Sequence, residues 1–452
     1  MRFCSCLLGV LLLVGSAAAQ ERLRLHGSNT IGEVLAPAMV ERWLRAEGYQ
    51  QIKRREVAFE EIELIARSAR GELIVEIHAH GSSTGFVDVA AGRADIAMSS
   101  RPVKASDRAL SQAVAGLDRA EQEIVIAMDG LAVIVHPSNP LRSLSRHQVR
   151  DIFSGKLSDW SMIPGGPRGP IRSHSRDDRS GTFDSFRAMV LAEAPLDKNS
   201  QRYESTEQLA RSVAGDPLAI GFVGLAGVRG VRALEISDGG QPLAPSVENV
   251  AVEDYPLSRR LYLYVTEPRN PLVDRFVKFA VSDQAQSVVE SVGFVSQAIR
   301  RYRPPPRSDA PEEYRQLVAE AERLSLNLRF GTGKSVLDGK NIRDIDRLAS
   351  FMQQAEHRDR PLILLGFSDV NETLPIMALR ISADRADFVA NLLVKRGIDP
   401  ARVRGLGGAL PVAPNDHDLG RQRNRRVEVW LGQGPLSAPS LASRGDGRNA
   451  AP

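Results

Sequence analysis

The most informative stretch of this sequence is Ser175-Arg176-Asp177-Asp178-Arg179-Ser180-Gly181-Thr182-Phe183. Two more loops combine glycine with hydroxyl residues where an apolar strand gives way to a helix: Gly27-Ser28-Asn29-Thr30-Ile31 and Gly81-Ser82-Ser83-Thr84-Gly85. A helix start exposes free N–H groups, and hydroxyls add donors, so such loops suit a tetrahedral oxyanion. Arg176 adds a planar, permanently charged guanidinium that can donate to two oxygens at once. Each loop alone could be an ordinary N-cap, but three loops with Arg176 predict an anion cradle.

The chain around these loops, from Glu21 to Ile299, alternates short apolar strands with helical stretches. The expected strands include Leu73 to Ile77, Glu123 to Ala127, Leu131 to Val135 and Leu261 to Val265, and one expected helix covers Leu35 to Arg45. This alternation predicts an α/β architecture with mainly parallel sheets. The segment is large for a single core, so we expect two lobes.

These motifs resemble the periplasmic phosphate-binding proteins that serve ABC transporters, which have the type II periplasmic binding-protein fold. The resemblance covers about Leu23 to Val295 and includes Ala94-Asp95-Ile96-Ala97-Met98-Ser99-Ser100-Arg101-Pro102, Asp151-Ile152-Phe153-Ser154-Gly155-Lys156 with Trp160, and Ala219-Ile220-Gly221-Phe222. It implies two lobes that close over a buried anion, and an ABC permease as partner. The implied ligand donors are the backbone of Thr30 and Ile31, together with Ser82, Arg176, Ser180, Gly181 and Thr182.

One position departs from that family. Where its members carry an Asp that accepts the proton of phosphate, this chain has Ser100, whose hydroxyl both donates and accepts. Asp95, Asp177 and Asp178 are the alternative acceptors. The resemblance therefore implies an oxyanion site that includes Ser100, and leaves open whether the anion is phosphate, sulfate or another oxyanion.

The start of the chain reads as a secretory signal peptide at residues 1–19, with Arg2, an apolar run from Leu7 to Val14 and small residues before Gln20. Both cysteines, Cys4 and Cys6, lie in this segment, so we expect an exported chain without thiols or disulfides. The net charge is only +4, and basic residues are interspersed with acidic ones. This pattern excludes a nucleic-acid partner.

A boundary is expected at residues 300–311, where the consecutive prolines Pro304 to Pro306 favour an extended spacer. It separates a first module, residues 20–299, from a second, residues 312–433. The last residues, 434–452, are rich in Ser, Ala, Gly and Pro and are predicted to be disordered.

The second module shows clear periodicity, with expected strands at Leu324 to Phe330, Leu362 to Leu365 and Val427 to Leu431. Helical spacing runs from Ile342 to Met352 and from Leu374 to Arg396. The order strand, helix, strand, helix, strand predicts a compact α/β sandwich.

Asp369 ends a strand of this module and Arg385 lies in the following helix, so the two could meet at one rim. A carboxylate and a guanidinium together suit a zwitterion, although a surface salt bridge is the simpler interpretation of these two residues alone. The ending Gly420 to Val427, of the form Gly-Arg-x-x-Asn-Arg-Arg-Val, resembles the OmpA-like C-terminal domain. The resemblance covers about Leu324 to Leu431. It implies that Asp369 and Arg385 bind the diaminopimelate of peptidoglycan, supported by Asn424 and Arg425.

The expected function is that of a periplasmic solute-binding protein that captures phosphate or a similar oxyanion and is anchored non-covalently to peptidoglycan. It would be associated with the cell wall, at the outer membrane, and would be neither an enzyme nor dependent on a cofactor. One alternative is a structural or adhesive wall module without ligand. Another is a phosphatase that uses Ser180, with His174 as the nearby base, but no Gly-x-Ser-x-Gly elbow surrounds this serine. His78 and His80, with no third ligand nearby in sequence, predict no metal site.

Overall fold

A computed structural model describes residues 21–434, except for residues 70, 118, 120, 179, 332–336, 373 and 417. The expected signal peptide at residues 1–19 lies outside the described residues, as do residues 435–452 of the expected tail. Within the described part of the chain, no helix has the length and apolarity needed to cross a membrane.

The first module has α/β structure throughout. Its strands are β1 (Glu21–Gly27), β2 (Gln51–Ala58), β3 (Glu61–Ser68), β4 (Gly71–His78), β5 (Ile96–Ser99), β6 (Glu123–Val135), β7 (Ser143–Ser145), β8 (Arg172–Arg176), β9 (Gln201–Tyr203), β10 (Ala219–Gly224), β11 (Arg232–Ala233), β12 (Glu235–Ser237) and β13 (Ser258–Val265). Its α-helices are α1 (Ala36–Ala46), α2 (Ser82–Ala90), α3 (Ala105–Arg108), α4 (Gln112–Ala115), α5 (Arg146–Phe153), α6 (Gly181–Phe186), α7 (Thr206–Ala214), α8 (Val247–Ala251), α9 (Pro271–Ala280) and α10 (Asp283–Ser291). A short π-helical turn, Ile31–Leu35, leads into α1.

The main sheet has the strand order β2-β3-β4-β1-β5-β13-β6-β10-β8-β9, with β11 also paired to β6. The prediction of mainly parallel sheets is wrong, because β13 and β10 both pair antiparallel with β6 and β3 pairs antiparallel with β4. Parallel pairing is confined to strands such as β1 with β4 and β5, and β8 with β9 and β10. The carboxyl ends of β1, β4 and β8 carry the three Gly, Ser and Thr loops.

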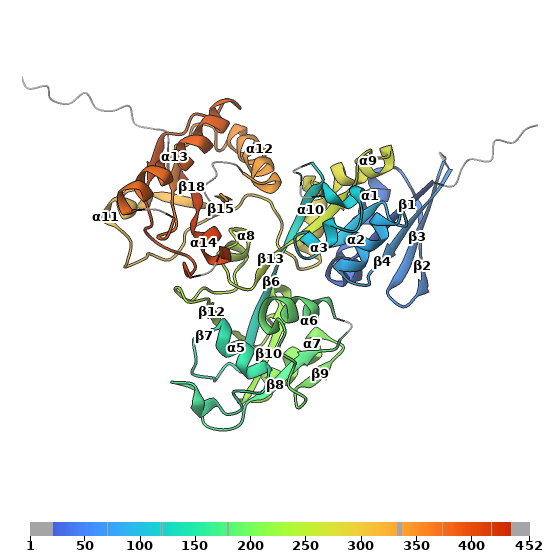
Figure 1. The fold of residues 1–452 in the computed structure, drawn as a ribbon, viewed down its shortest axis with the longest axis horizontal. Helices are drawn as coiled ribbons and strands as arrows, with labels where there is room; N and C mark the ends of the chain where they lie inside the picture. The colour runs from blue at the N-terminus through green and yellow to red at the C-terminus, as the bar shows by residue number, and fades with distance from the viewer. Residues whose placement is uncertain are drawn as a thin grey trace, which may run out of the picture.

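Strand β6 joins the two lobes. The sequence predicted two strands here, at Glu123 to Ala127 and Leu131 to Val135, but they form one continuous strand. Its first half pairs with β13 in the first lobe, and residues Leu131 to Val135 pair with β10 in the second. Asp129 and Gly130, which lie between the two predicted strands, belong to this continuous strand and are buried within the sheet. Figure 1 shows the lobes on either side of β6 and β13, the first blue and the second green.

Each lobe has its own apolar core. In the first, helix α1 places Met39, Val40, Trp43 and Leu44 at helical spacing against the sheet, and Trp43 meets Phe276 of α9 edge-on with ring centroids 5.1 Å apart. In the second, Phe186 of α6 stacks on Phe222 of β10 at 3.8 Å. These cores hold the starts of α1 and α6, which border the anion loops, in fixed positions.

The second module is a five-stranded sheet in the order β14-β15-β18-β16-β17, covered by helices. Its elements are β14 (Arg301–Tyr302), α11 (Glu312–Val318), β15 (Ala321–Arg329), α12 (Gly339–Gln353), β16 (Leu362–Gly366), α13 (Pro375–Val394), β17 (Arg402–Gly405), α14 (Asp418–Asn424) and β18 (Arg426–Gly432). The predicted α/β sandwich is confirmed, but its predicted order lacked β14, α11, β17 and α14. β17 was missed because Arg402 and Arg404 interrupt its apolar pattern; it pairs in parallel with β16.

The expected spacer at residues 300–311 is not a free linker along its whole length. β14 pairs with β15 at the edge of the second sheet, and the backbone N–H of Arg300 donates to the Ser325 hydroxyl at 2.8 Å. Ala310 is buried in a cluster with Tyr314 and Trp430. The segment therefore joins the second module directly to the end of the first.

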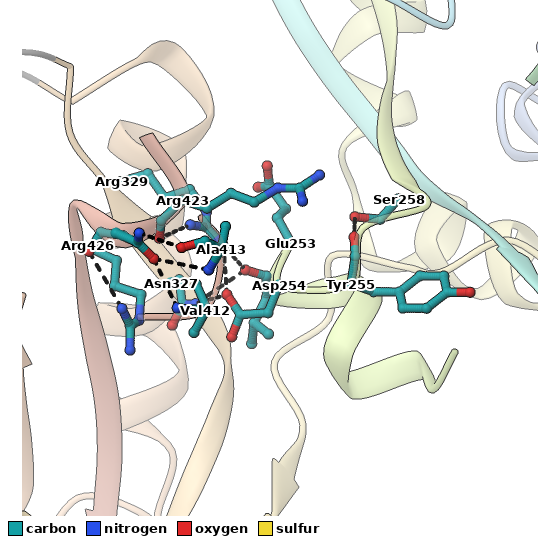
Figure 2. Close-up of polar contacts among 12 residues, drawn as sticks. Glu253, Asp254, Tyr255, Ser258, Asn327, Arg329, Val412, Ala413, Arg423 and Arg426 are labelled. Carbon is teal, nitrogen blue, oxygen red and sulfur yellow. Dashed lines mark hydrogen bonds and ion pairs between the residues drawn. The ribbon is translucent and has the colours of Figure 1, made fainter. Parts of the chain in front are cut away.

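The two modules are docked through buried charges at the boundary between α8 and β13. Asp254 of the first module accepts hydrogen bonds from Arg329 Nη2 at 2.8 Å and Asn327 Nδ2 at 3.1 Å, both on β15. Figure 2 shows Asp254 facing these two side chains across the boundary. A second contact joins Arg260 of β13 to Asp338, which caps α12, at 2.7 Å. Because Asp254 is 3% exposed, this boundary resembles a protein interior more than a flexible joint.

Candidate functional site

The two loops of the first lobe lie side by side, as the parallel pairing of β1 and β4 requires. The N–H of Gly81 donates to the carbonyl of Gly27 at 2.8 Å, and the N–H of Ser28 donates to the carbonyl of Met98 at 2.9 Å. Gly27 has φ +136°, and a Cβ there would lie 2.1 Å from the Met98 carbonyl oxygen. Only glycine allows this close approach, which brings the end of β5 to the same place.

Ser82 and Ser100 meet at this edge. The Ser82 hydroxyl accepts a hydrogen bond from the Ser100 N–H at 3.1 Å, and the two hydroxyl oxygens are 3.4 Å apart. Ser82 is the first residue of α2, so its hydroxyl lies beside the free N–H groups of a helix start. The structure thus brings together two of the predicted ligand residues from loops 18 residues apart.

The second lobe touches the first at Thr30. The Thr30 hydroxyl donates to the Gly181 carbonyl at 3.0 Å, and a Cβ at Gly181 would lie 2.7 Å from the Thr30 backbone nitrogen. Ile31, the other predicted backbone donor, is fully buried, and its N–H donates to the Ser28 carbonyl at 3.2 Å. The lobes are therefore closed on one another where the predicted anion loops meet.

Ser180 is the N-cap of α6, because its hydroxyl accepts a hydrogen bond from the Thr182 N–H at 3.2 Å. His174, the candidate base, instead has its Nδ1 2.9 Å from the hydroxyl of Tyr203. Burial lowers the pKa of His174. Among the described residues, Ser180 has no histidine within hydrogen-bonding distance, so the arrangement is that of a capped helix start and not of an activated nucleophile.

Arg176 is buried but does not reach the loops of the first lobe in this conformation. Its guanidinium donates to the carbonyls of Tyr203 and Glu204, at 3.2 and 2.9 Å, and to the hydroxyl of Thr206 at 2.6 Å. All three partners lie between the end of β9 and the start of α7. The structure therefore places this predicted ligand residue within the second lobe only.

The guanidinium found between the lobes is that of Arg259 on β13, a residue that the sequence analysis missed. Its Nη2 donates to the Thr30 hydroxyl at 2.6 Å and also to the Ser185 hydroxyl. Its Nε lies 3.2 Å from Asp129 Oδ2 on β6, and the Ser185 hydroxyl lies 3.1 Å from the same oxygen. Burial lowers the pKa of Arg259, and the charge of Asp129 opposes this change. No sequence motif marks Arg259, because only the strand pairing of β13 and β6 brings it to this place.

Two of the alternative proton acceptors, Asp95 and Asp178, pair with arginines. Asp95 accepts hydrogen bonds from Arg24 at 2.8 and 3.1 Å near the start of β5. Asp178 is exposed and pairs with Arg202 at 2.5 Å. Asp129, 6% exposed, is the buried carboxylate linked through Ser185 and Arg259 to the residues where the lobes meet.

In the second module, Asp369 and Arg385 are both buried, but they are not paired with one another. Asp369 Oδ2 accepts a hydrogen bond from Arg425 at 2.9 Å, and Arg425 also donates to the carbonyl of Phe330. Arg385 makes a two-pronged ion pair with Glu372, at 2.9 and 2.5 Å. Arg425, predicted as a supporting residue, thus contacts Asp369, whereas Glu372 was not foreseen.

Asn424 supports the loop that precedes α14. Its amide oxygen accepts the N–H groups of Val412 and Ala413, at 2.8 and 3.1 Å, and its amide nitrogen donates to Ala413 and Asn415. Four hydrogen bonds fix the side chain, which is 1% exposed. Asn424 thus acts in this structure by holding the segment 412–415.

Comparisons with known proteins agree with this architecture. Residues 15–284 match the family model of the PBP superfamily domain, and residues 329–425 match that of the OmpA family. Protein SphX of Synechocystis is 29% identical over 238 residues, 49% of this chain and 69% of that protein. The phosphate-binding protein PstS of Pseudomonas aeruginosa is 28% identical over 246 residues, 49% of this chain and 73% of that protein.

Among solved structures, a possible phosphate binding protein from Planctomyces limnophilus is similar over 61% of this chain and 93% of that chain, with a TM-score of 0.51 and 25% identity. The two-lobed fold of the first module and the α/β sandwich of the second, both expected from the sequence, are confirmed. The chain belongs to the PBP superfamily and carries an OmpA-family domain at its C-terminal end.

Proposed function

We propose that the first module captures phosphate or a similar oxyanion between its lobes and that the second module holds the protein to peptidoglycan. The contact that carries this proposal is the one between Thr30 and Gly181, because it brings helix starts from both lobes together. Free N–H groups at helix starts, glycine and hydroxyl donors are the groups that bind tetrahedral anions. The relatives named for phosphate binding support phosphate as the first choice.

The proposed ligand residues are Thr30, Ile31, Ser82, Ser100, Ser180, Gly181 and Thr182, with positive charge from Arg259 and Arg176. Arg259 already lies at Thr30. Arg176 would exchange its hydrogen bonds within the second lobe for bonds to the anion. A charge-assisted bond from a guanidinium to an anion in a site closed to water is among the stronger polar contacts.

Asp129 is the proposed acceptor that separates phosphate from sulfate. At neutral pH phosphate keeps a proton and sulfate has none, so a buried carboxylate near the anion favours phosphate and repels sulfate. Asp129 would accept the proton of phosphate in place of Ser100, whose hydroxyl can donate as well as accept. The Ser185 hydroxyl contacts both Asp129 Oδ2 and the Gly181 carbonyl, which links this carboxylate to the proposed site.

Isothermal titration calorimetry on the full chain with phosphate and sulfate tests the receptor. We expect saturable binding of phosphate that weakens by about 10- to 100-fold in Arg259→Ala and in Arg176→Ala, because each loses a charge-assisted bond of about 1.5–3 kcal/mol. Arg229→Ala, which changes an exposed arginine, is the control. If no anion binds, the alternative of a wall module without ligand replaces this proposal.

For the second module we propose that Asp369 and Arg385 bind the zwitterionic diaminopimelate, with Asn424 and Arg425 as supporting residues. Glu372 forms with Arg385 the ion pair that a ligand carboxylate would form, so binding requires that Glu372 be displaced. The protein would be exported by a signal peptide and would reside in the periplasm at the wall, next to the outer membrane. It would bind its anion and deliver it to an ABC permease, and it would not catalyse a reaction.

Co-sedimentation with purified peptidoglycan tests the anchor. We expect Arg385→Ala to abolish pelleting and Arg380→Ala, on an exposed part of the same helix, to leave it unchanged. Glu372→Gln should increase pelleting, because a neutral amide competes less well for the guanidinium. Weaker binding by Glu372→Gln would show that Glu372 helps to bind the wall and does not compete with it.

A further inference from the structure

A cluster of metal-ligating side chains lies on one face of the first lobe's sheet, outside the anion site. Glu76 and His78 are two residues apart on β4, so the alternation of a strand directs both to the same face. The parallel register of β1 and β4 places His26 directly beside His78. The histidine rings stack with centroids 3.9 Å apart.

These three residues have the geometry of a metal site. One ligand atom from each of His26, Glu76 and His78 lies within 4.8 Å of the others. In a tetrahedral zinc site, with bonds of about 2.0–2.2 Å to nitrogen and oxygen, the ligand atoms lie closer to one another than they do here. Small side-chain rotations would bring the three ligand atoms to that separation. Two neighbouring strands of a sheet hold the three Cα atoms in place, so rotation of the side chains is sufficient.

His26 is prepared to act as a ligand. Its Nδ1 lies 2.8 Å from Asp88 Oδ2 on α2, and because a carboxylate accepts hydrogen bonds, Nδ1 carries the proton. Its Nε2 is buried and has no hydrogen-bond partner, in a residue that is 5% exposed. With the proton on Nδ1, the other ring nitrogen, Nε2, has a free lone pair for a metal ion. A carboxylate that orients a histidine from behind is the usual arrangement around protein-bound metals.

The charges around the cluster are mixed. Glu61 on β3 lies opposite His78, with its Oε2 3.9 Å from Nε2 of that residue, and its Oε1 lies 2.9 Å from Nε2 of His80. Arg22 pairs with Glu76. A bound cation would take the place of the arginine charge at Glu76, whose side chain is 14% exposed, and Glu61 would contribute further negative charge.

We propose that His26, Glu76 and His78 form a binding site for Zn²⁺, with water or Glu61 completing a tetrahedral shell. Zinc binds imidazole together with carboxylate, whereas magnesium and calcium favour sites built from oxygen ligands alone. The ion would join β1 to β4 just before the Gly27 and Gly81 loops. Zinc would therefore hold together the two strands whose ends carry the first lobe's part of the proposed anion site.

The experiment is a zinc titration of the full chain, freed of any purification tag and of bound metal, in competition with a chromophoric chelator. We expect one zinc per chain, and at least about 100-fold weaker binding in His78→Gln and in Glu76→Gln, because each removes a ligand. His78 is partly exposed, so its variant should fold even if one at His26 does not. His147→Gln, an exposed histidine of α5, is the matched control and should bind zinc as the unaltered chain does.

Two further measurements complete the test. Co²⁺, used as a spectroscopic probe in place of zinc, should give the visible absorption of a tetrahedral site, and this absorption should be lost in His78→Gln. Asp88→Asn should bind zinc about 10- to 100-fold more weakly, since it removes the residue that orients His26. Absence of saturable zinc binding, or equal affinity in His78→Gln and the unaltered chain, would overturn the proposal. Phosphate binding is measured separately, so its failure does not affect this outcome.

Discussion

Removal of the Asp254 carboxylate should release the second module from the first. In Asp254→Ala, Arg329 and Asn327 lose the acceptor that they contact at 2.8 and 3.1 Å, and Arg323 loses one at 3.3 Å. Two of these donors are guanidinium groups that would remain buried beside an uncharged methyl. Breaking a buried ion pair in this way costs about 3–5 kcal/mol. Since about 1.4 kcal/mol is a factor of ten, the docking equilibrium should shift by roughly 10²- to 10³-fold or more.

The assay is a distance measurement between the modules. Spin labels on Ser161→Cys in the second lobe and Ser350→Cys on α12 use two exposed positions of a chain whose natural cysteines both precede residue 7. We expect a narrow distance distribution in the otherwise unaltered chain and a broad one in Asp254→Ala. Asp346→Ala is the control, because it removes an exposed pair with Arg396 that is worth about 0–1 kcal/mol. A distribution that stays narrow in Asp254→Ala would refute the claim that these charges hold the modules together.

Other predictions concern the anion site and a buried carboxylate of the second module. Gly181→Ala should weaken phosphate binding about 10- to 100-fold in calorimetry, because its Cβ would lie 2.6 Å from Thr30 Cα and press the lobes apart at a cost of about 1–3 kcal/mol; Gly224→Ala, with nothing within 4 Å, should have no effect. Asp129→Asn should reduce the preference for phosphate over sulfate, and an unchanged ratio of affinities would contradict its role as proton acceptor. Burial alone would raise the pKa of Glu428, but neighbouring guanidinium groups lower it from 4.5 to about 2. Its contribution, about 3 kcal/mol, is therefore complete above pH 4.5 and lost as pH falls toward 2, and urea unfolding of Glu428→Gln should show a weaker dependence on pH in this window.

The sequence was sufficient for those parts of the fold and site that depend on local pattern. The Gly, Ser and Thr loops predicted helix starts after strands, and the structure has α2 and α6 beginning at Ser82 and Gly181. The alternation from Leu324 to Phe330 predicted a strand with one buried face. The strand is present as β15, but its polar face is buried as well, because Asn327 and Arg329 contact Asp254 of the first module. Such features are local because hydrogen bonding and amphipathic spacing are decided within a few residues.

Long-range pairing could not be read from these patterns. The sequence predicted two apolar strands where β6 is one, because Asp129 and Gly130 interrupt the apolar pattern. Only the pairing with β13 shows that the strand continues through them. Arg259 carries no motif of its own, and it reaches Thr30 only through the pairing of β13 with β6. The docking of the modules depends on charges that would be classed as surface residues from sequence alone.

His26 shows the same limit in the proposed zinc site. The sequence placed His78 beside His80 and offered no third ligand, whereas the parallel register of β1 and β4 brings His26 to His78 from 52 residues away in the chain. By itself the sequence determined the α/β class of both parts of the chain and the helix starts at Ser82 and Gly181, because those follow from local composition and periodicity. The tertiary structure decided which side chains meet, since strand register and lobe closure join residues that the chain holds far apart.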